Sequence, residues 1–509
     1  MMKNKSRVVS SVMIITLVSK GMGFVRDMVL AFYFGATGIT DAYFVSQTIP
    51  EFLFSLVVQA ISVGFIPIYS EIVHTEGREK GDSFVDKLLT FCIILTCVLT
   101  IFVGLFGTQF VMIFASGFSD EITAVAVHFV RITVFAMFFR IATSIWSSYL
   151  QANNRFIFPA MVGIPLNVIV LVSIVAAAYT FTDMLAYGLV LASAGSMLLL
   201  LPSVIKSKGG YRFYKDFYSD KHIKRVLQLF IPISIGVGAN QINVLVDRTV
   251  ASSFSGGISA LNYANKVDNV LENVIVLSLA TVLFTTFADC VSKKDIQGFK
   301  RNVNKAIDII LITMIPISVY AIVFSTQIIQ LLFGHGQFDK VANTQTAIAM
   351  AYYSLGLVAL SVHAILTRAF YALNDVKTVT KNSCIAIVIN VGLNFLLPRI
   401  IGIGGIALAT SISNIYTAIS LLYLLQKKVG SMGYKKLTVD FLKLCVAAIC
   451  LGLSAYFSFS FFLLYLNYWI AFIFAIICGG MIFVLICLFL KPNSVVLALA
   501  LLKKKQNEA

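Results

Sequence analysis

The feature that most constrains this chain is a series of apolar runs, each about 20 residues long, that recurs from one end to the other. A helix of that length crosses the hydrocarbon core of a bilayer, whereas a barrel strand needs only about ten residues of alternating character. With 59% hydrophobic and 12% charged residues, the 509-residue chain has too little polar surface to cover a soluble globule. The sequence therefore predicts an all-α polytopic membrane protein.

The distribution of Lys and Arg tests the number and orientation of these helices. The apolar runs predict about fourteen transmembrane helices, over 8–34, 41–70, 84–107, 122–150, 158–180, 184–205, 222–253, 258–288, 302–325, 345–373, 382–398, 402–426, 438–459 and 464–490. With the N-terminus inside, 30 of the 39 Lys and Arg residues fall in inner segments, and only Lys340 and Arg399 fall in outer segments. The positive-inside rule demands such a bias, so we expect both termini in the cytoplasm. The first run lacks a small-residue cleavage site and continues to Phe34, which indicates a retained helix rather than a signal peptide.

An internal repeat is visible at an offset of 220 residues. It aligns VRDMVLAFYF (25–34) with LVDRTVASSF (245–254), and it aligns LQANNR (150–155) with FYALND (370–375). Because the offset contains six helices, an even number, we expect two parallel six-helix repeats followed by two additional C-terminal helices. The predicted division is an N-terminal lobe (1–205), a basic cytoplasmic linker (206–221), a C-terminal lobe (222–426), and a two-helix appendage with a cytoplasmic tail (427–509).

The first two helices carry charges inside apolar sequence. The segment from Lys20 to Glu51 also contains Arg26, Asp27 and Asp41. A charge in the bilayer interior costs several kcal/mol unless it is paired or hydrated, and it commonly marks a transport pathway. We therefore predict a charged cavity inside the membrane, although Arg26 and Asp27 could instead join helices, and Asp41 could cap the N-terminus of its own helix.

The matching helices of the second half are also polar. Asp247 and Arg248 are adjacent on the seventh predicted helix, where they too could join helices. The eighth predicted helix has two polar stripes. One consists of Asn262, Lys266, Asn269 and Asn273, and the other of Asn265, Asp268 and Glu272. Lipid does not tolerate such faces, so they must contact protein or water.

No enzymatic motif is present, since the sequence lacks HExxH, GxSxG and Walker A patterns. None of the eight cysteines belongs to a CxxC pair or a Cys/His cluster. We therefore expect a transporter rather than an enzyme, with no metal and no cofactor. The net charge of +16 is explained by membrane orientation and anionic lipid, so we expect no nucleic-acid partner.

Four motifs resemble the MurJ (MviN) family, the lipid II flippases of the multidrug/oligosaccharidyl-lipid/polysaccharide exporter superfamily. They are SKGMGFVRDMVLAFYFGATGITDAYFVSQTIP (19–50), GFIPIYSE (64–71), LLFGHGQFD (331–339) and AFYALNDVKT (369–378). The resemblance implies fourteen helices and movement of an undecaprenyl-linked peptidoglycan precursor to the outer leaflet of the bacterial inner membrane. It also implies that cavity cations hold the pyrophosphate of the lipid. The positions here that match the family's cavity are the cations Lys20 and Arg26 and the acids Asp27 and Asp41.

The chain departs from the family pattern in its cavity. The family's Ala-Asp-Arg at the start of the eighth helix reads Ala264-Asn265-Lys266 here, which keeps a cation but loses the guanidinium fork and the acid. The arginine pair expected after the second helix's proline is replaced by Phe54 and Ser55, and the nearby glutamate by Gln59. These departures leave a flippase for another polyprenyl-linked glycan, such as an exopolysaccharide or O-antigen repeat unit, as an alternative.

Our sequence-based hypothesis is an alternating-access flippase. Arg26, Lys20 and Lys266 would attract the pyrophosphate, and Asp27 and Asp41 would orient these cations. Polar stripes on the second and eighth predicted helices would contact sugar or peptide. The polyprenyl tail would stay in lipid, in a groove made by the appendage. The expected partners are the lipid-linked glycan, membrane lipids, a coupling ion or the membrane potential, and cell-wall synthesis enzymes. A drug or cation antiporter of the same superfamily and a non-transporting scaffold for cell-wall enzymes are the further alternatives.

Overall fold

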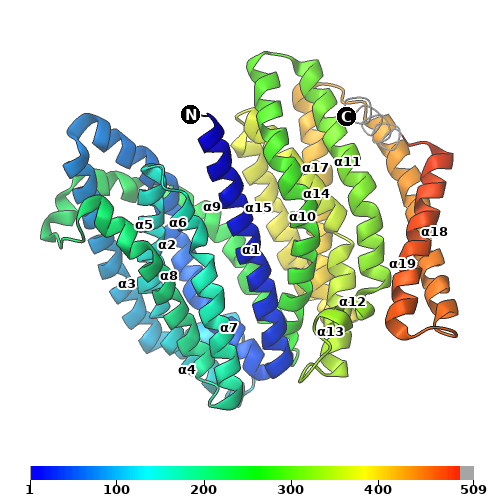
Figure 1. Ribbon diagram of the computed structural model, residues 1–509, viewed down its shortest axis with the longest axis horizontal. Coiled ribbons are helices and arrows are strands. Elements are labelled where there is room, and N and C mark those ends of the chain that lie inside the picture. The colour runs from blue at the N-terminus through cyan, green and yellow to red at the C-terminus, as the bar shows by residue number, and fades with distance from the viewer. Residues whose placement is uncertain (1, 493–509) are drawn as a thin grey trace. The chain divides into compact units, whose positions relative to one another are not determined.

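The computed structural model describes residues 2–492, without the side chains of 2–9, 56, 60–63, 229–237, 239–240, 274–275 and 277–282. Every regular element in this range is a helix (Figure 1). The helices are α1 (Met2–Phe34), α2 (Gly38–Glu76), α3 (Arg78–Phe114), α4 (Asp120–Thr133), α5 (Ala136–Ala152), α6 (Ile157–Met161), α7 (Gly163–Tyr179), α8 (Met184–Lys208), η1 (Lys215–Ser219), α9 (Lys221–Ala251), α10 (Gly257–Ser292), α11 (Ile296–Val323), α12 (Ser325–Leu332), α13 (Lys340–Ser354), α14 (Leu357–Ala372), α15 (Val376–Leu396), α16 (Pro398–Ile401), α17 (Gly404–Val429), α18 (Tyr434–Phe462) and α19 (Tyr468–Leu490).

The predicted fold class is confirmed. Within residues 2–492, nine helices are long and apolar enough to cross a membrane, and two bent pairs raise this number to eleven. The long helices α1, α9 and α10 account for the remaining predicted spans, so each of the fourteen predicted helices overlaps a helical segment. The predicted tail beyond 492, and the side chains of the inner cations Lys3, Lys5 and Arg7, lie outside the described residues.

Large apolar side chains cover the outer faces of these helices. Leu105 of α3 is 71% exposed and Phe489 of α19 is 85% exposed. An apolar surface of this kind would aggregate in water, but it is the surface that hydrocarbon favours. The exposed faces therefore agree with a multi-pass membrane protein.

Two predicted helices are broken rather than straight. The predicted helix 122–150 is the pair α4 and α5, bent by 42°, and the predicted helix 345–373 is the pair α13 and α14, bent by 46°. At the second break Ser411 of α17 shares its hydroxyl proton between the carbonyl oxygens of Tyr352 and Tyr353, at 2.6 and 3.0 Å. Hydroxyl groups of neighbouring helices thus satisfy the carbonyls that the bend removes from the helical ladder.

The local geometry repeats at the offset seen in the sequence. The bent pairs begin at Asp120 and Lys340, and two residues after each pair ends there is an asparagine with positive φ, Asn154 at 60° and Asn374 at 57°. The next backbone N–H donates to the carbonyl five residues earlier in both places, at 2.8 Å from Arg155 and 2.9 Å from Asp375. The same helix ending, 220 residues apart, agrees with two copies of one structural unit.

The chain packs into two compact units whose residue ranges differ from those of the predicted lobes. One unit comprises residues 1–259 with 333–342, and the other comprises 260–332 with 343–509. Packing defines these units, whereas the repeat defines the lobes, so the predicted division at residues 205, 221 and 426 stays a prediction.

The two C-terminal helices pack together and against α11. Phe324, at the end of α11, makes edge contacts with Phe459 of α18 and Phe472 of α19. The hydroxyl of Tyr320 donates to the carbonyl oxygen of Ile476 at 2.6 Å. Aromatic packing and one partly buried hydrogen bond thus fix the C-terminal pair to α11.

Loops of the first unit interlock at one end of its helices. The turn 333–339 contacts the end of α1, where the backbone N–H of Gln337 donates to the carbonyl oxygen of Phe32 at 2.8 Å. Gly256, between α9 and α10, has a φ of 70°, and a Cβ there would lie 2.1 Å from the carbonyl oxygen of Ala36. We call this contact of loops 35–37, 252–256 and 333–339 the loop junction. The loop junction requires glycine at position 256, both because of the positive φ and because a Cβ would clash with Ala36.

We predict that Gly256→Ala lowers the melting temperature of the purified chain in detergent by more than Gly209→Ala does. Gly209 also has a positive φ, 81°, but an added Cβ at this position would meet nothing within 4 Å. An alanine in the left-handed region costs about 1–2 kcal/mol in either place, and only Gly256→Ala adds a backbone clash. Equal melting temperatures for the two variants would contradict the described packing of the loop junction.

A second prediction concerns Asp375, which caps α15 and accepts a hydrogen bond from the Lys428 ammonium group. That bond, with those from Thr378, lowers the pKa of Asp375 from its ordinary value of 3.8 to about 2. Because the folded pKa is the lower one, the stabilisation is present above about pH 4 and is lost as the pH falls through about 2. Asp375→Asn should therefore lower the melting temperature near neutral pH, and the difference from the parent should shrink below about pH 4.

The control is Asp295→Asn. Asp295 caps α11 through the backbone N–H of Gly298 at 2.7 Å and forms no ion pair among the residues that the structure describes. Its effect on melting temperature should depend less on pH. If the difference in melting temperature between Asp375→Asn and the parent chain stays constant from pH 7 to below about pH 4, the ion pair with Lys428 does not contribute to stability.

Candidate functional site

The best-defined charged group of the first unit is centred on Arg26 of α1. Its Nε and Nη2 both donate to Oδ1 of Asp27, at 2.9 and 2.7 Å. Its Nη1 donates to Oδ1 of Asn167, on α7, at 3.3 Å. The Arg26 side chain is 15% exposed and that of Asp27 is 8% exposed. The guanidinium is thus held in place while part of it remains accessible.

The sequence brings α7 close to α1 at this point. The Asn167 amide nitrogen donates to the carbonyl oxygens of Ser19 and Gly163, at 3.0 and 2.8 Å. A Cβ at Gly163 would lie 2.0 Å from the Ser19 hydroxyl oxygen, so only glycine permits this approach. Asn167 therefore bridges the two helices and positions Arg26.

Two further predicted site residues lie around this group. Glu51 of α2 is exposed, and its carboxylate attracts the Arg26 guanidinium electrostatically. Lys20 is exposed on α1, six residues before Arg26. The structure thus places Arg26, Asp27 and Glu51 in one electrostatic group and leaves Lys20 exposed on the same helix as Arg26.

The alternative interpretation of Asp41 as the N-cap of its own helix is wrong. The first turn of α2 contains Asp41, but the N-cap of that helix is Thr37, and Asp41 does not cap its own helix. Its Oδ1 instead accepts hydrogen bonds from the backbone N–H of Ser259, at 2.7 Å, and from the Ser259 hydroxyl. Asp41 is 1% exposed, and it satisfies a backbone donor in the first turn of α10.

Arg248 lies beside this contact. Its Nη1 donates to the carbonyl oxygen of Ile258 at 3.3 Å, and its charge attracts the Asp41 carboxylate. Asp247, its neighbour on α9, is half-buried. Asp41, Arg248 and Ser259 therefore form a second charged group of the first unit, next to the loop junction.

The polar stripe of α2 serves helix packing at one position. The Gln241 amide nitrogen of α9 donates to the Ser55 hydroxyl at 2.7 Å. Ser55 stands where the family pattern has an arginine, and here it joins two helices.

In the second unit, the polar residues of α10 divide differently from the two predicted stripes. The Asn269 amide donates to Oδ1 of Asn265, and the Asn273 amide donates to the carbonyl oxygen of Asn269 at 2.6 Å. Asn265 is exposed, and Asn262, Lys266 and Asn269 are half-buried. These side chains give one accessible polar face that includes the cation Lys266.

Asp268 is separated from that face. It is 6% exposed, and its Oδ1 accepts a hydrogen bond from the Ser354 hydroxyl at 2.9 Å. Ser354 is the last residue of α13, at the break before α14, and it is fully buried. The predicted grouping of Asp268 with Asn265 is therefore not supported, because burial turns the carboxylate toward the broken helix.

Sequence reasoning missed three residues of these groups, namely Asn167, Ser259 and Ser354. Each is an uncharged residue of a kind common in membrane helices, and its partner lies far along the chain, for example 218 residues away for Ser259. The one sequence signal that pointed toward such long-range partners was the internal repeat, since it predicted that helices of both halves contribute to the site.

Among the described residues, no three His, Cys, Asp or Glu side chains gather in a way that could hold a metal ion. The charged group around Arg26 and the polar face of α10 are suited instead to binding anionic and hydroxyl-rich groups through hydrogen bonds.

Comparison with known proteins identifies the class to which these features belong. The family model described as lipid II flippase MurJ matches residues 30–479. The probable lipid II flippase MurJ of Buchnera aphidicola subsp. Acyrthosiphon pisum is 30% identical over 416 residues, which cover 79% of this chain and 80% of the relative. The lipid II flippase MurJ of Burkholderia cenocepacia is 27% identical over 427 residues, covering 81% of this chain and 82% of the relative.

Solved structures agree with the sequence relatives. A lipid II flippase MurJ in an inward closed conformation superimposes with a TM-score of 0.80 at 25% identity, covering 94% of this chain and 98% of that one. An inward-facing multidrug resistance MATE transporter of the MOP superfamily gives a TM-score of 0.68 at 14% identity, covering 82% and 98% of the two chains, and shares the fold alone. The chain belongs to the MurJ family of lipid II flippases.

Proposed function

We propose that this chain moves lipid II, the undecaprenyl-pyrophosphate-linked peptidoglycan precursor, from the inner to the outer leaflet by alternating access. The observation that carries this proposal is the family match, which covers both repeats from residue 30 to residue 479. The family consists of transporters, so the prediction that the chain is not an enzyme is confirmed.

The arrangement around Arg26 supports recognition of a pyrophosphate. Arginine binds phosphate oxygens through pairs of parallel hydrogen bonds, and such bonds strengthen where water is scarce. The Arg26 guanidinium is oriented by Asp27 and Asn167 but remains 15% exposed, so less side-chain entropy is lost when an anion binds. In this proposal Lys20 adds a second positive charge, and Lys266 adds a third from α10.

The remaining parts of the substrate have candidate sites as well. The Asn265, Asn269 and Asn273 face of α10 offers amide donors and acceptors to sugar or peptide. In the second unit, an apolar pocket of about 570 Å³ lies between α11, α14, α17 and α18, with Leu311, Ile315, Val362 and Phe441 among its lining residues. This pocket supports the prediction that the polyprenyl tail lies near the appended helices.

The energy source, the location and the further partners extend the proposal. The chain is a multi-pass membrane protein, and we propose the bacterial inner membrane with both termini in the cytoplasm. Since the sequence has no ATPase motif, we propose that the membrane potential or an ion gradient acts on the charged groups. Contact with cell-wall synthesis enzymes is a further part of the proposal.

The replacement of arginine by Lys266, and of the acid beside it by Asn265, favours a second candidate. A site with fewer guanidinium groups is suited to a different polyprenyl-linked glycan, such as an exopolysaccharide or O-antigen unit. The complementation experiment described next distinguishes lipid II from such a glycan as the substrate.

That measurement is complementation of a bacterium depleted of its essential lipid II flippase. We expect the chain to restore growth and to restore exposure of the precursor on the outer leaflet. We also expect Arg26→Ala to abolish both at an equal amount of protein in the membrane, because the fixed guanidinium is lost. Arg26→Lys, which keeps the charge without the fork, should restore them only in part.

The matched control is Arg212→Ala, which removes a cation that is exposed outside the membrane spans. Full activity of Arg26→Ala would remove the pyrophosphate assignment from Arg26. Lysis of cells in which the unaltered chain is present in the membrane would exclude lipid II as the substrate, and export of a polyprenyl-linked exopolysaccharide would then be measured.

The last prediction of this proposal concerns Asp41. We propose that its bonds to Ser259 hold the loop junction closed in the conformation described here. Asp41→Ala leaves a buried backbone N–H without its acceptor, which costs about 1–3 kcal/mol. We therefore expect Asp41→Ala to lower the melting temperature more than Ser259→Ala, which removes only the hydroxyl bond. If both variants melt like the parent chain, Asp41 does not stabilise this conformation.

A further inference from the structure

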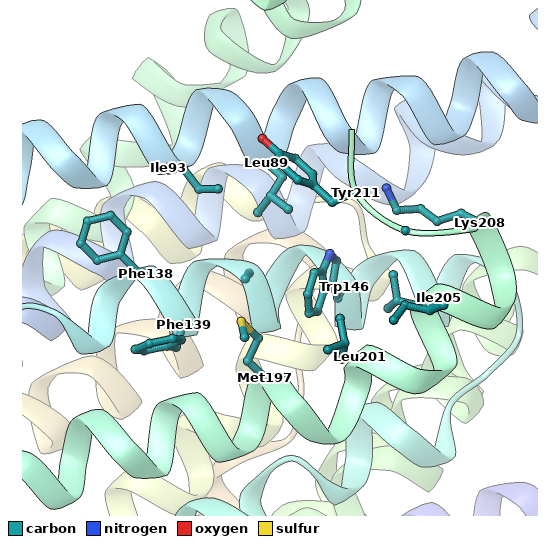
Figure 2. A pocket seen from close by; sticks show the side chains of 13 residues that line it. Leu89, Ile93, Phe138, Phe139, Trp146, Met197, Leu201, Ile205, Lys208 and Tyr211 are labelled. Carbon is teal, nitrogen blue, oxygen red and sulfur yellow. The ribbon is translucent and has the colours of Figure 1, made fainter. Parts of the chain in front are cut away.

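The first unit contains an apolar pocket that the proposed transport site does not use. It lies between α3, α5 and α8, has a volume of about 370 Å³, and is lined by side chains that include Leu89, Ile93, Phe139, Met197 and Leu201 (Figure 2). That volume is within the range of ~300–1,000 Å³ found for ligand pockets.

The pocket reaches the surface of the unit. Among its lining residues Ile205 is 49% exposed and Tyr211 is 41% exposed. Helices α3 and α8 are candidate membrane spans, and α5 belongs to a bent span. A pocket that opens on the outer faces of such helices is accessible to lipid.

One polar atom inside the pocket lacks a partner. Nε1 of Trp146 is buried and has no hydrogen-bond acceptor among the described residues, and the whole side chain is 6% exposed. Figure 2 shows the indole nitrogen on the side of the ring that faces Tyr211. Buried indole N–H groups usually find an acceptor, so the pocket is suited to a ligand that is mostly apolar and carries an acceptor near Tyr211.

The chain segment at the end of the pocket is fixed in place. The Lys208 ammonium group and the backbone N–H of Arg212 both donate to Asp86 of α3, the second at 3.2 Å. The Tyr211 hydroxyl is 2.8 Å from the Thr90 hydroxyl. These bonds fix residues 208–212 at the edge of the pocket. We call this segment, together with the exposed cations Lys206, Arg212 and Lys215, the basic rim.

Lys208 is paired with Asp86, but the three exposed cations of the basic rim are not neutralised by nearby acids. The acids of the same loop, Asp216 and Asp220, are both bound by the Lys87 ammonium group, at 2.9 and 3.0 Å. Lys206, Arg212 and Lys215 form no ion pair among the residues that the structure describes. Exposed aromatic side chains lie in the same segment, with Phe213 62% exposed and Tyr218 69% exposed. Cations mixed with exposed aromatic rings are typical of a segment that lies at the headgroup level of a membrane.

We propose that this pocket binds an anionic phospholipid. One acyl chain fills the space between α3, α5 and α8, an ester carbonyl oxygen accepts the hydrogen bond of Trp146 Nε1, and the phosphate lies against the basic rim. Anionic lipids are enriched where basic segments border a membrane, so the predicted cytoplasmic location of residues 206–221 places this lipid in the inner leaflet. The proposal goes beyond transport, and it does not require that the chain moves lipid II.

The two tryptophans of the chain make the proposal measurable. Trp469→Phe leaves Trp146 as the single fluorophore, and Trp146→Phe leaves Trp469, at the start of α19, as the control. Each full-length variant is placed in phosphatidylcholine bilayers that contain increasing fractions of phosphatidylglycerol with brominated acyl chains, which quench indole fluorescence on contact. Brominated phosphatidylcholine serves as the neutral probe.

We expect quenching of Trp146 by brominated phosphatidylglycerol to saturate at a several-fold lower lipid fraction than quenching by brominated phosphatidylcholine. Trp469 should follow the bulk composition equally for both lipids. Ala142→Phe, which fills the pocket, should remove the excess quenching of Trp146. Replacing Lys206, Arg212 and Lys215 by Ala should remove only the preference for phosphatidylglycerol, and these exposed positions are not needed for folding.

Three results would overturn the proposal. Quenching of Trp146 that follows bulk composition equally for both lipids would show that no lipid is bound specifically. A preference for phosphatidylglycerol that survives loss of all three cations would remove the basic rim from the site. Displacement of the brominated lipid by undecaprenyl pyrophosphate would assign the pocket to the tail of the transported lipid instead.

Discussion

The cost of placing a charge in hydrocarbon is the constraint on which this structure depends. Arg26 and Asp27 are adjacent on α1, and neither would be stable in lipid alone. Their ion pair and the amide of Asn167 replace the water that the guanidinium loses, while a small exposed fraction remains for an anion. The packing of α7 against α1 is therefore set by the need to hold this charge.

The same requirement explains the irregular parts of the fold. At the break between α13 and α14, the hydroxyl of Ser411 on α17 donates to the carbonyl oxygens of Tyr352 and Tyr353. At the start of α10, the carboxylate of Asp41 accepts a backbone N–H that no carbonyl of its own helix can accept. Breaks and helix ends in a membrane protein need such partners because lipid offers none.

The two proposals made above place two separate lipid sites in the first unit. The charged group around Arg26 suits the headgroup of a transported lipid, whereas the basic rim and Trp146 suit a lipid that stays bound. The two sites share no residue, since Arg26 lies on α1 and Asn167 on α7, while the pocket is formed by α3, α5, α8 and the segment after α8.

The sequence by itself determined the class of the protein, the approximate positions of the fourteen predicted helical segments, the offset of 220 residues, and the presence of Arg26, Asp27 and Lys266 within apolar sequence. These properties depend on composition and on patterns along the sequence, which can be recognised without knowing the tertiary structure. Only the tertiary structure decided that Asp41 binds Ser259 rather than its own helix, that Asn167 orients Arg26, and that Asp268 turns away from Asn265 toward Ser354. Each of these contacts joins residues more than 80 positions apart, and uncharged serines and asparagines give no pattern that distinguishes a partner from a bystander. Their roles follow from which helices pack together, and that packing is fixed by side chains along the whole length of each helix.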